Sequence, residues 1–181
     1  RQKSFFGTGL VAHISMANPV CKKLGKSIME AAQNIGLTIS DKATYLVMEG
    51  PQFSSKAESK LYQSWNCDLI GMTNMPEAKL AREAEICYSS ISMVTDFDCW
   101  HPEHDEVTVE KIIKTLQENS ENAKNLIIEL TKLREKSQSE LSCPCQFALD
   151  NAIITNPKNW DKSKVEACSA VAGRILKTIS K

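Results

Sequence analysis

The stretch from Met48 to Trp100 constrains the fold more than any other part of this chain, because it combines three signatures of one α/β unit. The first is a Gly-Pro turn that is followed by an aromatic residue, Phe53. The second is the pair Met72-Thr73, which ends a short apolar run. The third is an apolar run from Ile86 to Thr95 that stops at two carboxylates. This succession predicts buried strands that alternate with helices.

The two carboxylates, Asp96 and Asp98, follow a run that is typical of a strand buried on both faces, since it is short, apolar and free of Gly and Pro. Side chains two positions apart on an extended chain point to the same side, so both carboxylates can face one cleft. Ligands of open α/β sheets bind beyond the carboxyl ends of the strands, and a carboxyl group in a dry pocket can serve as an acid near neutral pH. The alternative is that this Asp-x-Asp only caps a turn or the next helix. With the two preceding signatures, the pair predicts a site that holds a purine nucleoside and donates a proton to its base.

A metal site is the other interpretation of this region, because Cys99, His101, His104 and Asp105 are all plausible ligand types. However, Pro102 breaks any helix that would align the two histidines, and no second Cys/His pair follows at zinc-finger spacing. We therefore predict a solvated loop and no bound metal here.

Strand and helix patterns alternate along the chain. Strands are predicted over 9–15, 44–48, 69–73 and 86–95. Helices are predicted over 19–35, 55–65, 76–85, 108–136, 144–153 and 162–179, with loops over 136–142 and 155–162.

The charge balance limits the classes of partner. The chain has 22 acidic and 22 basic residues, so no net field attracts nucleic acid or an anionic membrane. No apolar run approaches the roughly 20 residues that span a bilayer. We predict a single domain over 1–181, a cytoplasmic location, and neither nucleic acid nor membrane as a partner.

Three segments resemble one known family in both order and spacing. They are EGPQFSSKAES, MTNMPEAKLAREAEICYSSISMVTDFDCW and the following VTVEKIIKTL. They are similar to the methylthioadenosine phosphorylases, in the trimeric branch of the purine nucleoside phosphorylase superfamily, and the similarity runs from Gly9 to about Leu133. It implies a phosphorylase/hydrolase-like α/β fold in three layers, with a central mixed sheet flanked by helices, of which this chain is the C-terminal part.

The resemblance also implies a reaction. Phosphate attacks the anomeric carbon of 5'-methylthioadenosine and releases adenine and 5-methylthioribose 1-phosphate. By position, Asp96 would supply or stabilise the proton at N7 of the base, and Asp98 would accept a hydrogen bond from the exocyclic amine. Members that prefer 6-oxopurines generally carry Asn in this region, so two aspartates favour adenine. Further matches are Phe53 against the base, Met72 under the ribose, Thr73 on phosphate, His13 at the methylthio pocket of a neighbouring subunit, and Val109, Ile112 and Ile113 as apolar lining.

One expected part of the family pattern has no match in this sequence. The phosphate loop of the family is Gly-rich and is followed by Arg, His and Thr ligands, whereas this chain has seven glycines and no Gly-Gly-Thr-Gly-like segment. We therefore expect an N-terminal fragment of the same polypeptide to complete the fold. Gln52 stands where several relatives have Arg. The resemblance further implies a homo-oligomer, either a trimer or a hexamer, with inorganic phosphate as co-substrate and no cofactor.

Two other functions remain open at this stage. One is a broader adenosine phosphorylase, or a nucleosidase that uses water. The other is a non-catalytic relative that binds nucleosides.

The seven cysteines show no disulfide-scaffold spacing. Some thermophilic relatives form a disulfide in a Cys-x-Cys near the C-terminus, but for Cys143 and Cys145 we expect two free thiols. Four others lie in or beside apolar segments and are predicted to be small buried hydrophobic residues: Cys21, Cys67, Cys87 and Cys168.

Overall fold

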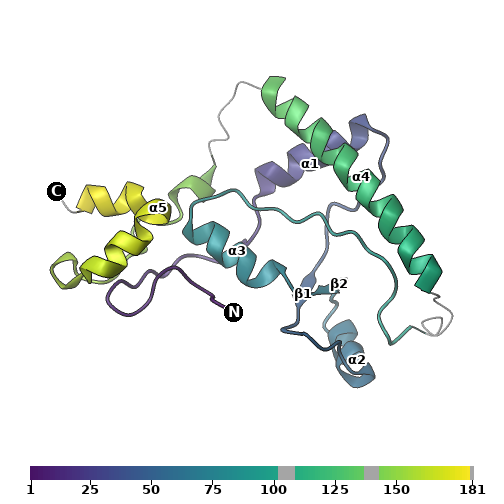
Figure 1. The fold of residues 1–181 in the computed structure, drawn as a ribbon, viewed down its shortest axis with the longest axis horizontal. Helices are drawn as coiled ribbons and strands as arrows, with labels where there is room; N and C mark the ends of the chain where they lie inside the picture. Colours follow the sequence, from purple (N-terminus) through teal and green to yellow (C-terminus); the bar gives the residue numbers. More distant parts are fainter. Residues whose placement is uncertain (102–108, 137–142, 180–181) are drawn as a thin grey trace. The chain divides into compact units, whose positions relative to one another are not determined.

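The computed structural model describes residues 1–101, 109–136 and 143–179 (Figure 1). The chain separates into two units, each with its own internal packing. Unit 1 comprises Arg1–Leu24, Met75–Ser89 and Ser139–Lys181, and unit 2 comprises Gly25–Asn74 and Ser90–Gln138.

Unit 1 is built around the C-terminal helix α5 (Lys162–Ile179). Cys168, Ala172 and Leu176 recur every four residues, so they share one face of α5, and this face is buried. The N-terminal segment and the chain before α5 cover that face with the buried side chains of Phe6, Leu10, Leu149 and Ala152. The strand predicted over 9–15 is reduced to isolated antiparallel bridges, Leu10 with Gly7 and Ala12 with Ile153.

Polar contacts join the C-terminal end of α3 (Asn74–Glu83) to the rest of unit 1. The regular turns of α3 begin at Pro76, since Met75 has extended backbone angles, as a proline at the first helical position predicts. The buried carboxylate of Glu83 accepts hydrogen bonds from Ser4 Oγ and Phe5 N, both at 2.7 Å. These bonds fix the start of the chain against α3.

A second polar group in unit 1 centres on Arg174 of α5. Its guanidinium donates to both carboxylate oxygens of Glu85, at 2.8 and 2.5 Å, and to Asp150 Oδ1 at 2.6 Å. Hydrogen bonds to Glu85 and Asp150 raise the pKa of Arg174 above its usual value. Glu85 also accepts a hydrogen bond from the backbone N–H of Leu149. Arg174 of α5 and Glu85 thus connect α5, the chain after α3 and the chain around Asp150.

The sheet of unit 2 has two parallel strands, β1 (Tyr45–Val47) and β2 (Leu69–Gly71), which pair in the register Tyr45 with Leu69. The helix α2 (Lys56–Ser64) forms the crossover between them. Its first turn is held by a capping box, in which Ser55 and Glu58 exchange hydrogen bonds.

Two further helices complete unit 2. From Gly25 onward, α1 (Lys22–Asn34) belongs to this unit, and it lies beside α4 (Val109–Lys136) in Figure 1. Asn34 Nδ2 donates to Glu129 Oε1 at 3.0 Å and so joins the two helices. Gly36, with a φ of +68°, ends α1 close to the predicted position.

The remaining short elements are 3₁₀ turns, η2 (Pro144–Phe147) and η3 (Pro157–Asn159). The helix predicted over 144–153 is therefore wrong beyond its first turn. Asn151 adopts a left-handed φ of +59°, after which the chain turns into the bridge with Ala12. That left-handed residue is incompatible with a continuing right-handed helix.

The strand predicted over 86–95 is also wrong, since the described chain forms no strand there. A strand needs a hydrogen-bonded ladder partner beside it, and burial on both faces needs packed layers above and below, whereas this segment makes isolated contacts. Cys21 N donates to Tyr88 O at 2.7 Å, and Asn119 Nδ2 donates to Val94 O at 2.8 Å. The side chains of Ile86 and Val94 are more than half exposed, so the segment is not buried on both faces. Among the described residues, no helix is long and apolar enough to cross a membrane.

Candidate functional site

The first segment of the candidate site follows β1 in unit 2. Because β1 and β2 are parallel, the chain leaves both strands at the same edge of the sheet. Met48 N donates to Gly71 O at 2.9 Å and extends the pairing by one residue at that edge. The Gly-Pro turn then leads into Phe53, which is 89% exposed.

The second segment, Met72-Thr73, follows β2 and packs against the first. Gly50 has a φ of +67°, and a Cβ placed on it would lie 2.5 Å from the Sδ of Met72. The turn after β1 and the thioether after β2 are therefore in close contact, and a side chain at position 50 would require Met72 to move. Thr73 is exposed at the same edge.

The third segment, which contains the carboxylates, is anchored near the start of α2. Cys99 Sγ lies 3.2 Å from the Oγ of Ser59 and 3.8 Å from the carbonyl oxygen of Ser54, the residue after Phe53. Ser59 is buried, so this anchor is dry. The turn after β1, the pair Met72-Thr73 and the chain at Cys99 thus all belong to unit 2, where Gly50 meets Met72 and Cys99 meets Ser54 and Ser59.

The two carboxylates occupy this third segment as parts of a turn and not at a strand end. Asp98 Oδ1 accepts from Cys99 N at 2.8 Å, and its carbonyl accepts from His101 N at 3.0 Å. Asp98 therefore caps a turn, as the alternative interpretation predicted. Asp96 is exposed, and its Oδ1 accepts from Thr95 Oγ1 at 2.5 Å. The second oxygen of each carboxylate is not used in these bonds and is chemically able to accept from a ligand.

An aromatic group beside the carboxylates was not anticipated from the sequence. The rings of Phe97 and His101 stack at 4.1 Å with an interplanar angle of 11°, and Trp100 meets both edge-on. The spacing of these rings, at three and four residues, was the available signal. Cys99 bonds to serines, and His104 and Asp105 lie outside the described residues.

The other predicted site residues belong to elements other than the segments that follow β1 and β2. Val109, Ile112 and Ile113 occupy the first turns of α4 in unit 2, where Ile112 is half-buried and Ile113 is 49% exposed. His13 belongs to unit 1. Its side chain is exposed, and its backbone N–H donates to the carbonyl oxygen of Ala152 at 2.8 Å.

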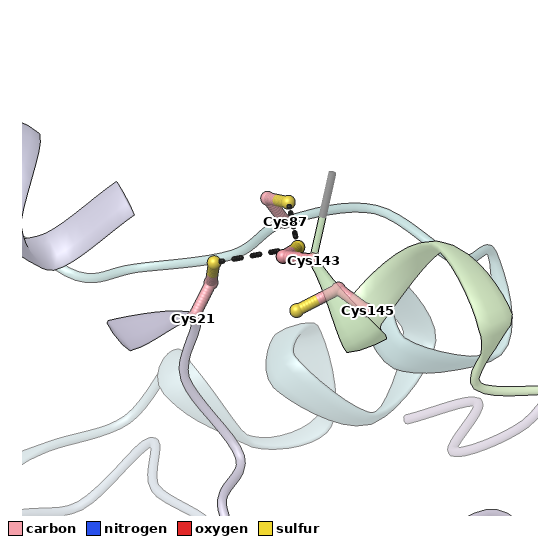
Figure 2. Close-up of side chains that lie close together, drawn as sticks. All are labelled: Cys21, Cys87, Cys143 and Cys145. Carbon is pink, nitrogen blue, oxygen red and sulfur yellow. Dashed lines mark hydrogen bonds between the residues drawn. The ribbon is translucent and has the colours of Figure 1, made fainter. Parts of the chain in front are cut away.

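A separate group of four cysteines lies in unit 1 (Figure 2). Burial raises the pKa of the Cys87 thiol well above its usual range and, with a hydrogen bond to Cys143, raises that of Cys145 to about 11. Burial also acts on Cys143, but hydrogen bonds from Cys87, from the Cys145 backbone and from the other thiols outweigh it and lower the Cys143 pKa to about 7. No local pattern in the sequence predicts that Cys21 and Cys87 meet the Cys-Pro-Cys segment.

Comparison with known proteins identifies the family. A model described as "Phosphorylase superfamily" matches residues 1–132 of this chain. The chain belongs to the phosphorylase superfamily. Membership confirms the predicted α/β class, which the helices and the parallel sheet also display.

Two bacterial relatives match almost the whole of this superfamily member. It is 54% identical over 179 residues to the S-methyl-5'-thioadenosine phosphorylase of Cereibacter sphaeroides, a match that covers 98% of this chain and 61% of the relative. It is 51% identical over 176 residues to that of Rhodospirillum rubrum, covering 97% of this chain and 60% of the relative. The resemblance predicted from the motifs is thereby confirmed.

Solved structures agree with the sequence matches. A methylthioadenosine phosphorylase from an antarctic soil metagenomic library superposes with a TM-score of 0.84 at 41% identity, over 94% of this chain and 60% of that one. The methylthioadenosine phosphorylase of Schistosoma mansoni in complex with adenine gives a TM-score of 0.75 at 25% identity, over 85% and 62%. The superfamily member described here thus spans about three fifths of the length of these relatives.

Proposed function

We propose that this chain, completed by an N-terminal segment of the same polypeptide, catalyses the phosphorolysis of 5'-methylthioadenosine. The products are adenine and 5-methylthioribose 1-phosphate. The observation that carries the proposal is the 54% identity, across almost the whole chain, to a relative named S-methyl-5'-thioadenosine phosphorylase. The contact of Gly50 with Met72, and those of Cys99 with Ser54 and Ser59, support it.

The proposed chemistry assigns separate roles to the two carboxyl groups. As the glycosidic bond breaks, positive charge develops on the sugar and negative charge on the departing base. Asp96 supplies or stabilises a proton at N7 and so neutralises the base, a contribution of typically about 10²–10⁴-fold in rate. Asp98 accepts from the exocyclic amine of adenine. With a 6-oxopurine its lone pairs would face a carbonyl oxygen, which disfavours that base.

The other predicted site residues are assigned to the base, the ribose, the phosphate and the methylthio group of the substrates. Phe53 presents an almost fully exposed ring on which a purine base can pack. Met72 lies next to the turn that carries this ring and would contact the ribose, while the Thr73 hydroxyl would bind phosphate. An apolar pocket favours a methylthio group over a 5'-hydroxyl by about 1–3 kcal/mol. We assign that pocket to Val109, Ile112 and Ile113, and to His13 of a neighbouring subunit.

The proposal includes the partners of the complete protein. Inorganic phosphate is the co-substrate, no cofactor takes part, and the protein assembles as a trimer or hexamer in the cytoplasm. The N-terminal segment supplies the phosphate loop and the remaining phosphate ligands.

The test is an analysis of products from the full polypeptide, incubated with methylthioadenosine in the presence and absence of phosphate. We expect adenine and 5-methylthioribose 1-phosphate in equal amounts, and only with phosphate. Adenine release at the same rate in water alone would show a nucleosidase instead. Binding of adenine without any turnover would show a non-catalytic relative. Adenosine, assayed in parallel, measures how strongly the methylthio group is preferred.

A further inference from the structure

The four-cysteine group of unit 1 has the composition of a metal site. Its sulfur atoms come from three segments that are far apart in the sequence (Figure 2). Cys21 immediately precedes α1, Cys87 follows α3, and Cys143 and Cys145 stand at the start of η2. This arrangement does not involve the candidate site of unit 2, so a role for these cysteines is independent of the proposed function.

The distances between the sulfur atoms suit a tetrahedral ion. All four Sγ atoms lie within 4.8 Å of one another, with Cys21 and Cys143 at 3.9 Å and Cys87 and Cys143 at 3.1 Å. A zinc–sulfur bond of about 2.3 Å places neighbouring sulfurs of a tetrahedron about 3.8 Å apart. A disulfide requires about 2.05 Å, so no two of these thiols are joined by one.

The surroundings of the sulfurs also fit bound thiolates. Cys21, Cys143 and Cys145 are only 4%, 8% and 5% exposed, and Leu24 packs against them. Cys87 is half-buried. Sulfurs gathered in this way have little to gain from hydrogen bonds to one another, since thiols are weak donors and acceptors. A cation at their centre would satisfy all four.

Two donors reach the sulfurs from outside the group. The backbone N–H of Leu24 donates to Cys21 Sγ at 3.4 Å, and Arg82 Nη1 donates to Cys145 Sγ at 3.6 Å. N–H groups that point at ligand sulfurs are the usual outer contacts of metal–thiolate sites. A divalent ion with four thiolates carries a net charge of about −2, which a guanidinium at this position partly offsets.

We propose that Cys21, Cys87, Cys143 and Cys145 bind one Zn²⁺ ion in a structural site. Binding replaces four S–H bonds by four Zn–S bonds and releases the protons to solvent, with no change of oxidation state. Four protein ligands fill the tetrahedron and leave no position for water or substrate, so the ion has no catalytic role. It joins the chain before α1, the chain after α3 and the start of η2, and thereby stabilises unit 1.

The test is the metal content of the full polypeptide, purified under reducing, chelator-free conditions and measured by mass spectrometry of the elements. We expect about one zinc per chain in the parent protein and in the control Cys67→Ser, whose half-buried thiol lies outside the group. The double variant Cys143→Ser/Cys145→Ser should lose the zinc. Circular dichroism shows whether it keeps its helices.

Cobalt gives a readout that does not depend on the variants. The reduced, metal-free protein titrated with Co²⁺ should develop the visible absorption bands of tetrahedral cobalt thiolate and saturate at about one ion per chain. Addition of Zn²⁺ should abolish the bands. The proposal is overturned if the parent protein holds no more zinc than the double variant and shows no such bands. It is equally overturned if peptide mapping finds the four cysteines paired as disulfides.

Discussion

Replacement of Gly50 by alanine tests the contact on which the edge of unit 2 depends. Gly50 has a φ of +67°, where a side chain costs about 1–2 kcal/mol. The new Cβ would also lie 2.5 Å from Met72 Sδ, well inside the 3.5–4.0 Å of an ordinary contact, and would drive Met72 off its rotamer for about 0.5–1.5 kcal/mol. We expect Gly50→Ala to lower the free energy of unfolding by about 1.5–3.5 kcal/mol in total.

The chain offers a matched control for the backbone part of this loss. Gly36 has almost the same φ, +68°, but a Cβ there would meet nothing within 4 Å. Gly36→Ala should therefore cost only the backbone contribution. Urea unfolding with linear extrapolation measures both variants. In a Met72→Ala background the cost of Gly50→Ala should fall to that of Gly36→Ala. Equal losses of stability for the two glycine variants in the parent protein would refute the contact, as would an unchanged cost of Gly50→Ala after removal of Met72.

Two further predictions concern polar contacts. Arg174→Ala should lower the free energy of unfolding by about 1.5–3 kcal/mol, because Glu85 keeps its charge while it loses two charge-assisted hydrogen bonds. Unaltered thermal unfolding would contradict this. Ser55→Ala should cost about 0.5–2 kcal/mol through loss of the α2 cap. Side-chain and backbone hydrogen bonds from Ser55 lower the pKa of Glu58 below 4.5, so this stabilisation is present above pH 4.5 and disappears as the pH falls through the lowered value. The loss in Ser55→Ala should accordingly be smaller at acidic pH than at neutral pH, and an equal loss at both would contradict it.

The sequence predicted best those elements whose signals are local. The helix predicted from residue 55 begins at the Ser55 cap of α2, and the helix predicted to residue 35 ends at Gly36, because caps and glycines act on the backbone within a few residues. The helices α4 and α5 follow from the period of their apolar residues. The contact between the turns that follow β1 and β2 agrees with their parallel pairing, whereas the strand expected to end at Asp96 and Asp98 was not found.

The failures share a different cause, which is dependence on distant residues. An apolar run such as 86–95 carries no information about whether strands flank it, and in the described chain none do. The helix predicted over 144–153 ends early because Asn151 turns the chain towards Ala12, more than a hundred residues away in the sequence. The four-cysteine group was missed for the same reason, because its members come from three segments and only the Cys-Pro-Cys pair is local.

The carboxyl groups of Asp96 and Asp98 are central to the proposed function, because they are assigned to recognise and protonate an aminopurine base. The most direct measurement compares kcat and KM of the full polypeptide with those of Asp96→Asn and of the exposed control Asp41→Asn, with methylthioadenosine as substrate. We predict that Asp96→Asn lowers kcat by about 10²–10⁴-fold with little change in KM, and that Asp41→Asn leaves both unchanged. An Asp96→Asn enzyme that turns over at the parental rate would contradict the assigned role.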